Sequence, residues 1–409
     1  MDRWLFAWRR LERRMWFRAS LYALVGVAVA LLAVVGAPWV PDAVADRLGG
    51  ESVEEILTIL ASSLLVVATF SLGAMVTAYT AVSSTATPRA AVLVTGDEGT
   101  QKALATFVGA FLYAIVGVTA INANYYGAEG RAIIFIVSLG VVALVAFRLL
   151  AWIGRLSDLA RVGHMIGLVE GCACDALSDR ARRPRLGGVA GALEGGFEIT
   201  APDTGYVQNV DPDRLAETAE ALDCRVQVTV MPGAFVLRGD ILARLDQPGC
   251  EKKARRRFLS AFTIGHSRSF DQDPRYGLIV LAEIATRALS PGVNDPGTAI
   301  QVVGAGVRLL DGWARPAGQA ADMPEPSARV LAPALDPDDL MTDIFEPIAF
   351  HGAGDPAVLI RLRKGLAALA RASPELAPSA ARVDGRLLAR AEAALPSAQD
   401  FTAVANALN

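Results

Sequence analysis

The sequence predicts a membrane α-helical protein with four transmembrane helices, joined to a cytosolic α+β domain that contains a small β module. Two observations lead to this fold class. The 409 residues are 53% hydrophobic and only 20% charged, and their mean hydropathy is +0.37. Disordered proteins have low hydrophobicity and high net charge, so this composition argues against disorder. The long uncharged stretches also all fall within residues 19–154, which separates a membrane part from a soluble part.

Four apolar segments are long enough to cross the hydrocarbon core of a bilayer, which takes about 20 helical residues. They are Ser20–Val40, Val53–Ser83, Ala103–Ile121 and Ala132–Trp152. A cleaved signal peptide is the competing interpretation of the first segment, but its apolar run exceeds the usual length of about 7–15 residues. We therefore expect a four-helix transmembrane domain over 19–154.

Positive charges near the spans set the expected orientation, because Lys and Arg resist translocation. Residues 1–18 contain six arginines interleaved with aromatic residues, which predicts a basic, amphipathic arm on the cytoplasmic membrane surface. The loop after the first span is acidic, and Arg148, Arg155 and Arg161 lie near or after the end of the fourth span. Both termini are therefore expected in the cytoplasm.

The second span carries small and hydroxyl residues in a regular order. They recur every eleven residues in two series, which places all of them on one helix face: Thr58, Thr69 and Thr80, and then Ser62, Gly73 and Ser84. Such a stripe is typical of close helix packing, which we slightly favour, or of a pore face lined by several copies of the helix. Glu51, Glu54 and Glu55 precede the stripe and would form an acidic outer mouth that concentrates cations.

Beyond the spans, residues 155–312 are expected to form the cytosolic α+β domain. A helix should run to Pro184, and alternating apolar residues then predict short strands at Phe197–Thr200, Gly205–Val210, Arg225–Val230 and Ile241–Leu245. Residues 313–339 are rich in Pro and Ala and predict a long surface loop. Residues 340–409 predict C-terminal helices.

The densest polar constellation of the chain lies within 263–301. Its members are expected at helix ends and in the adjoining turns: His266, Arg268, Asp271, Asp273, Arg287, Asn294, Asp295 and Thr298. Asp273 and Asp295 each stand directly before a proline, which is the pattern of an N-cap followed by the first helical residue.

Three functions of this constellation are open. His266, Asp271 and Asp273 could hold a metal ion or move protons, but no nucleophile elbow, P-loop or HExxH motif accompanies them. A small anion could bind at the two helix N-termini, near Arg268 and Arg287. We expect helix capping to dominate, with no catalytic residue, no metal and no cofactor.

The string ALSPGVNDPGTA, over Ala288–Ala299, carries a resemblance to a known family. Together with Gly265, Arg268, Gln272-Asp273 and Gly205-Tyr206-Val207, it is similar to a family of bacterial integral-membrane proteins of unknown function. The resemblance implies four spans with a cytosolic domain and a location in the inner membrane. It implies no chemistry.

Two functions from different classes follow. The first is an oligomeric channel-like or transport protein in which copies of the second span form the path. The second is a non-conducting membrane scaffold or sensor whose cytosolic domain binds a partner or small ligand; an enzyme ranks third. A stripe accessible in the membrane favours the first, and a stripe buried within one subunit favours the second. The expected partners are the lipid bilayer, further copies of the chain and a small anionic ligand, whereas a net charge of −3 argues against nucleic acid.

Overall fold

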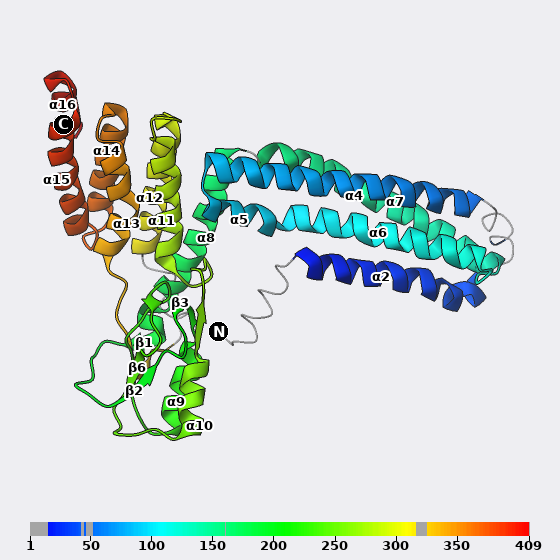
Figure 1. Cartoon of the computed structure of the whole chain (residues 1–409), viewed down its shortest axis with the longest axis horizontal. Coiled ribbons are helices and arrows are strands. Elements are labelled where there is room, and N and C mark those ends of the chain that lie inside the picture. Colours follow the sequence, from blue (N-terminus) through cyan, green and yellow to red (C-terminus); the bar gives the residue numbers. More distant parts are fainter. Residues whose placement is uncertain (1–14, 42–44, 46–51, 160, 316–324, 409) are drawn as a thin grey trace. The chain divides into compact units, whose positions relative to one another are not determined.

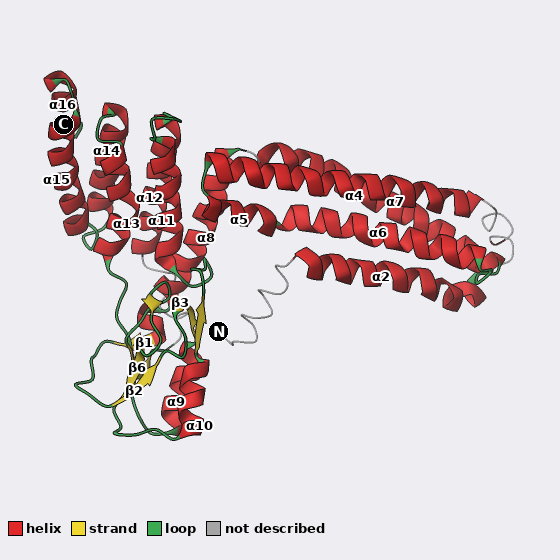
Figure 2. Cartoon of the chain, in the orientation of Figure 1, coloured by secondary structure: helices red, strands yellow, loops and turns green. Residues whose placement is uncertain are grey.

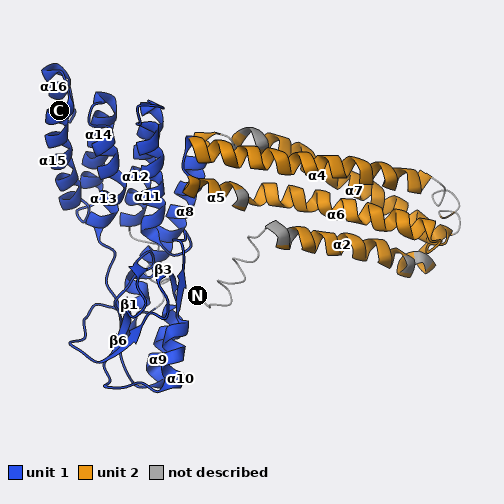
Figure 3. Ribbon diagram, in the orientation of Figure 1, with its two compact units in different colours: residues 1–6, 85–87, 165–409 blue, residues 7–84, 88–164 orange. Residues whose placement is uncertain are grey.

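The computed structural model describes the chain except for residues 1–14, 42–44, 46–51, 160, 316–324 and 409. Helices dominate the described residues, and the strands are confined to one region of the chain (Figures 1 and 2). The chain divides into two compact units (Figure 3). We call residues 7–84 and 88–164 the membrane unit, and the remainder, mainly 165–409, the α/β unit.

The membrane unit is entirely helical in its described residues. Its elements are α2 (Met15–Gly36), the short 3-10 helix η1 (Ala37–Trp39), α4 (Ser52–Thr85), α5 (Pro88–Gly96), α6 (Glu98–Asn122) and α7 (Ala128–Leu159). Three of its helices are long and apolar enough to cross a membrane, namely Ser52–Thr85, Glu98–Asn122 and Ala128–Arg155. These correspond to the second, third and fourth predicted spans.

The first predicted span is only partly supported. Ser20–Val40 was expected to be one helix, but α2 ends at Gly36 and its described apolar part, Ala19–Ala33, is shorter than the three candidate spans. Pro38 explains the early end, because proline has no N–H to donate and disfavours helical geometry in the residue before it.

Small residues allow the membrane helices to approach closely. A Cβ atom added to Gly109 of α6 would lie 2.8 Å from the carbonyl oxygen of Tyr22 on α2, and one added to Gly26 would strike the backbone of Gly109. Glycine at both positions therefore permits a backbone-to-backbone crossing of α2 and α6, the usual role of small residues between membrane helices.

Buried polar groups make further connections within the membrane unit. Tyr126 donates a hydrogen bond to the carbonyl oxygen of Ala30 on α2 (2.6 Å), and the hydroxyls of Tyr113 on α6 and Ser138 on α7 lie 3.0 Å apart. The helix α4 joins the bundle through apolar contacts, with Leu57 against Gly117 of α6 and Phe70 against Trp152 of α7.

In its described residues, the α/β unit contains nine α-helices, one 3-10 helix and eight strands. Its first elements are α8 (Val162–Arg182), which starts just before the boundary, η2 (Pro184–Gly187), β1 (Gly188–Val189), β2 (Phe197–Thr200), β3 (Gly205–Val210), α9 (Pro212–Ala221), β4 (Val226–Val228), β5 (Phe235–Val236) and β6 (Ile241–Leu245). They continue with α10 (Lys252–Ser260), β7 (Phe262–Gly265), α11 (Pro274–Ala288), α12 (Pro296–Ala314), β8 (Ser327–Leu331), α13 (Pro337–His351), α14 (Pro356–Ala372), α15 (Ala377–Ala394) and α16 (Ala398–Ala405).

The strands form two small sheets. The larger has the order β1-β8-β4-β6-β2, with parallel pairs on either side of β8, and the smaller is the antiparallel sheet β5-β3-β7. Three predicted strands match β2, β3 and β6, and the fourth, Arg225–Val230, includes the shorter β4. The long loop expected over 313–339 is interrupted by β8.

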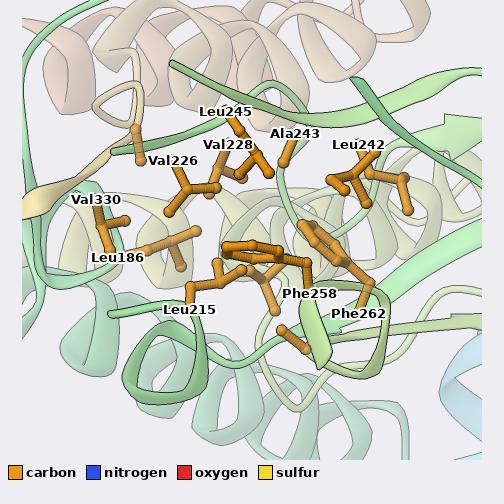
Figure 4. Packing of buried hydrophobic residues seen from close by; sticks show 14 of the residues in the cluster. Leu186, Leu215, Val226, Val228, Leu242, Ala243, Leu245, Phe258, Phe262 and Val330 are labelled. Atoms are coloured by element: carbon orange, nitrogen blue, oxygen red, sulfur yellow. The ribbon is translucent and has the colours of Figure 1, made fainter. Parts of the chain in front are cut away.

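One hydrophobic core holds the β module together (Figure 4). Phe258 from α10 is fully buried beside Leu215 of α9, and strand residues such as Val226 and Leu242 close the cluster. The helices α11 to α16 pack beside one another as a bundle (Figure 1). Arg275 of α11 fastens this bundle through a two-pronged ion pair with Asp343 of α13.

Candidate functional site

The predicted stripe of α4 lies on the outside of the membrane unit. All six of its residues, Thr58, Ser62, Thr69, Gly73, Thr80 and Ser84, are exposed, whereas Leu57, Leu60, Leu64 and other apolar residues on the opposite face are buried. A Cβ atom added to Gly73 would meet nothing within 4 Å. The described residues of the chain therefore leave this face of α4 uncovered.

Four of the five hydroxyls of the stripe donate hydrogen bonds within their own helix. Thr69 donates to the carbonyl oxygen of Leu65 (2.8 Å), and Thr80 donates to that of Val76 (2.9 Å), the back-bonding geometry of Ser and Thr in membrane helices. Ser62 and Ser84 likewise bond to carbonyls of the preceding turn. These hydroxyls can therefore face lipid, another helix or water without leaving a donor unbonded.

The helix face that carries the stripe also contains apolar residues. At about 100° per residue, exposed Leu65, Val66 and Val76 fall on the same helix face as the hydroxyls. The acids that were expected to form an outer mouth begin at Glu51, which lies outside the described residues. Glu54 and Glu55 occupy the first turn of α4, where a negative charge also stabilises the positive end of the helix dipole.

In the α/β unit, the family-like string forms the tight turn between α11 and α12. Asn294 has a φ of 50°, in the left-handed region where Asn is one of the few tolerated side chains, and its N–H donates to the carbonyl oxygen of Ser290 (2.9 Å). Asp295 then caps α12 by accepting hydrogen bonds from the backbone N–H (3.1 Å) and the hydroxyl (2.6 Å) of Thr298. These bonds, above all that of the hydroxyl, lower the pKa of Asp295.

A second cap, at the start of α11, is buried and paired with an arginine. Asp273 is 1% exposed and accepts from the backbone N–H groups of Arg275 (3.1 Å) and Tyr276 (3.2 Å). Arg268 grips the same carboxylate with Nε (2.7 Å) and Nη2 (3.0 Å), and its guanidinium lies 5.2 Å from the ring centroid of Tyr276. Gly233, at a φ of +96°, packs so closely that a Cβ atom there would strike the Asp273 carboxylate.

The neighbouring loop is held in place by a side-chain amide. Gln272 accepts from the backbone N–H of Val210 on β3 (2.7 Å) and donates to the carbonyl oxygen of the same residue (2.9 Å). This pair of bonds extends the β3–β7 sheet to the start of α11, so that the cap at Asp273 has a fixed position against the sheet.

The structure does not assemble the proposed metal or proton-transfer set. His266 and Asp271 are exposed, Asp273 is committed to Arg268, and no group of three His, Cys, Asp or Glu side chains in the described part of the chain is arranged to hold a metal ion. Asp271 instead bonds to the hydroxyl of Ser269.

The two helix N-termini that were considered for an anion site lie far apart. Pro274 and Pro296 begin successive helices, and the 15 residues of α11 between them span about 22 Å. Arg268 and the exposed Arg287 consequently lie at opposite ends of α11. Both N-termini are already occupied by their own aspartate caps.

The structure adds one residue that the sequence analysis missed. Arg180 of α8 is 5% exposed, and its two terminal guanidinium nitrogens have no hydrogen-bond partner among the described residues. Burial is the main cause that lowers the pKa of its guanidinium to about 10. The signal was present in the sequence, because Arg180 continues the apolar face of α8 formed by Ile166, Val169 and Ala173 at helical spacing.

Comparison with known proteins finds relatives that match part of the chain. Two of the most similar curated relatives are uncharacterized proteins of Mycobacterium bovis and Mycobacterium tuberculosis, each 41% identical over 110 residues, which make up 26% of this chain. The matched part is only 21% of the length of these relatives. No solved structure matches the chain.

A sequence profile described as "Predicted membrane protein (DUF2254)" matches residues 12–368, which include the candidate spans, both sheets and the α11–α12 turn. With most of its length matched, the chain belongs to this family of predicted membrane proteins.

Proposed function

We propose that the chain is the subunit of an oligomeric channel-like or transport protein. The observation that carries this proposal is the exposure of the whole α4 stripe in a single subunit. Packing inside one subunit would bury the stripe, but the described residues leave it uncovered. Copies of α4 that face one another in a ring would cover it and enclose a path lined partly by hydroxyls.

The proposal includes a topology with four spans in the bacterial inner membrane and both termini in the cytoplasm. The 22 residues of α2 measure about 33 Å, enough for the hydrocarbon core, so α2 would be the fourth spanning helix. The charge pattern of the loops supports the orientation, because basic residues precede α2 and follow α7. The α/β unit would then be a cytosolic regulatory domain without an enzymatic role.

A non-conducting membrane sensor or scaffold is the second candidate. It is favoured by the mixed character of the α4 face, where Leu65, Val66 and Val76 are exposed among hydroxyls that already bond to their own helix. Such a face suits dry contact between helices of neighbouring subunits. In this case the oligomer would hold α/β units together without forming a water path.

Cysteine accessibility separates the two functions. Thr58, Thr69 and Thr80 would each be changed to Cys in a chain whose four native cysteines, all in the α/β unit, are replaced by Ala. Leu72→Cys is the matched control, since Leu72 is 44% exposed on α4 but lies about 80° around the helix from the centre of the stripe.

For a path, charged water-soluble thiol reagents should modify all three stripe cysteines in membranes and should spare Leu72→Cys. Dry packing predicts no modification of any of them, although each would form a disulfide with its copy under oxidation. Equal modification of the stripe and the control would contradict both functions.

A further inference from the structure

The helix α10 presents a basic face to solvent. Ala254 and Phe258 are buried on one side of the helix, and Phe258 belongs to the core of the β module. At about 100° per residue, the exposed arc is centred on Arg256. It carries all five cations of the helix, each of them exposed: Lys252, Lys253, Arg255, Arg256 and Arg257. We call these five residues the basic face of α10.

The basic face has no acidic partner among the described residues. Its one side-chain hydrogen bond joins Nη2 of Arg255 to the hydroxyl of Thr200 (3.2 Å), and its cations form no ion pair with any described carboxylate. Other exposed arginines of the α/β unit do form such pairs, for example Arg382 with Asp338. An anionic partner from outside the chain would therefore find these charges available.

The charge pattern of α10 also works against its own helix. Lys252 and Lys253 occupy the first turn, where positive charge opposes the helix dipole. Arg256 and Arg257 stand four residues after these lysines, a spacing at which like charges destabilise a helix. The helix forms because its apolar side is buried in the core. A local pattern that costs stability is expected where function requires it.

Two exposed apolar side chains lie on strand β5 and directly after it. Phe235 and Leu237 are 57% and 56% exposed, on either side of the buried Val236. The ring of Phe235 packs against that of Tyr206, with the ring centroids 5.0 Å apart. We call Phe235 and Leu237 the apolar pair.

Hydrogen bonds connect the apolar pair and the basic face to the same segment, residues 200–204. In the turn after Leu237, the N–H of Gly239 donates to the carbonyl oxygen of Ala201 (3.0 Å). Arg255 of the basic face bonds to Thr200, the residue before Ala201. Both features therefore border one short segment of the surface.

Positive charge predominates in the three segments that build this surface. Residues 200–204, 235–240 and 251–257 together hold six cations and three acids, which leaves +3, whereas the whole chain has a net charge of −3. The acids are Asp203, Asp240 and Glu251.

We propose that the basic face of α10 and the apolar pair bind the surface of a bilayer that contains anionic lipids. Clustered Lys and Arg attract anionic headgroups, and exposed aromatic and aliphatic side chains enter the interface beside them. The chain itself supplies this partner, because it belongs to a family of membrane proteins and only two residues separate α7 from α8. Such a tether keeps a bilayer surface at high effective concentration. The inference requires a membrane location but not a path lined by α4.

Fluorescence quenching in nanodiscs tests the proposal on the full chain. A fluorophore is attached to Leu237→Cys after the four native cysteines are replaced by Ala, and nitroxides on lipid headgroups act as quenchers. Nanodiscs of phosphatidylcholine with phosphatidylglycerol should quench the fluorophore strongly. Phosphatidylcholine alone should quench it weakly, and so should high salt, because the Debye length falls to about 3 Å at 1 M.

The labelled chain with Lys252→Glu, Lys253→Glu and Arg256→Glu should lose this quenching. Each Lys or Arg at an anionic surface contributes about a fivefold factor, so the ratio of bound to free surface should fall by about 100-fold or more. The helix should still fold, since acids in the first turn suit the helix dipole.

The matched control carries the same three charge reversals on α14, at Arg361, Lys364 and Arg371, which are also exposed. This control should keep full quenching with phosphatidylglycerol. Quenching that survives in the α10 variant, or that does not depend on phosphatidylglycerol, would overturn the proposal. Absence of quenching in both kinds of nanodisc would also overturn it and would assign the basic face to an acidic protein or nucleic acid instead.

Discussion

Asp295 shows how much a single side chain contributes to the turn between α11 and α12. Its carboxylate accepts two hydrogen bonds from Thr298, so Asp295→Ala should destabilise the α/β unit by about 1 kcal/mol at neutral pH. The folded state lowers the pKa of Asp295 from its ordinary value of 3.8. The carboxylate therefore stabilises the fold above pH 3.8, and this contribution disappears as the pH falls through the lower pKa of the folded state.

Unfolding of the two proteins between pH 7 and pH 3 checks this prediction. The difference in stability should be largest at neutral pH and should shrink in acid. Asp271→Ala is the control, because Asp271 is exposed and caps no helix. A difference that grows as the pH falls would show that the carboxylate is not the stabilising form.

Residue by residue, the capping pattern was the most predictable part of the site. Asp273 and Asp295 each precede a proline and each cap a helix as expected. Arg180 was missed because a single arginine on the apolar face of a helix gives no sign in the sequence of whether it is buried. Only the packed structure shows that it is. The separation of Arg268 from Arg287 follows from the 15-residue length of α11, so the sequence already contained it.

At the scale of elements, local periodicity predicted helices well and strands unevenly. The strands β2, β3 and β6 have enough alternating residues to be recognised, whereas β1 and β5 have two residues each. The strand β8 pairs with β1 and β4, which are separated from it by more than 90 residues, and no local pattern reports such a pairing.

The crossing of α2 and α6 makes a prediction at the same scale. Gly109→Leu should destabilise the membrane unit by about 2 kcal/mol, because the added side chain must displace the backbone of Tyr22. Gly140→Leu on α7 is the matched control, since a Cβ atom there meets nothing within 4 Å. Thermal unfolding in detergent should give a lower Tm for Gly109→Leu than for Gly140→Leu. Equal Tm values would contradict a close crossing of α2 and α6 at Gly109.

For the whole molecule, the central claim is that subunits associate through the exposed face of α4. A path enclosed by one stripe per chain needs several chains, because one or two helices cannot surround a channel. The face is available in the subunit, since Gly73 and the hydroxyls beside it are uncovered by the described residues. Gly73→Leu should leave the subunit fold intact and weaken association, because the added side chain would meet only a neighbouring copy.

Native mass spectrometry of the protein extracted with its lipids tests this claim most directly, because it counts subunits. A path lined by α4 requires a ring of four or more subunits, and we expect a lower count for Gly73→Leu. A monomer or a dimer would contradict an α4-lined path and would leave the membrane sensor as the better description of the protein.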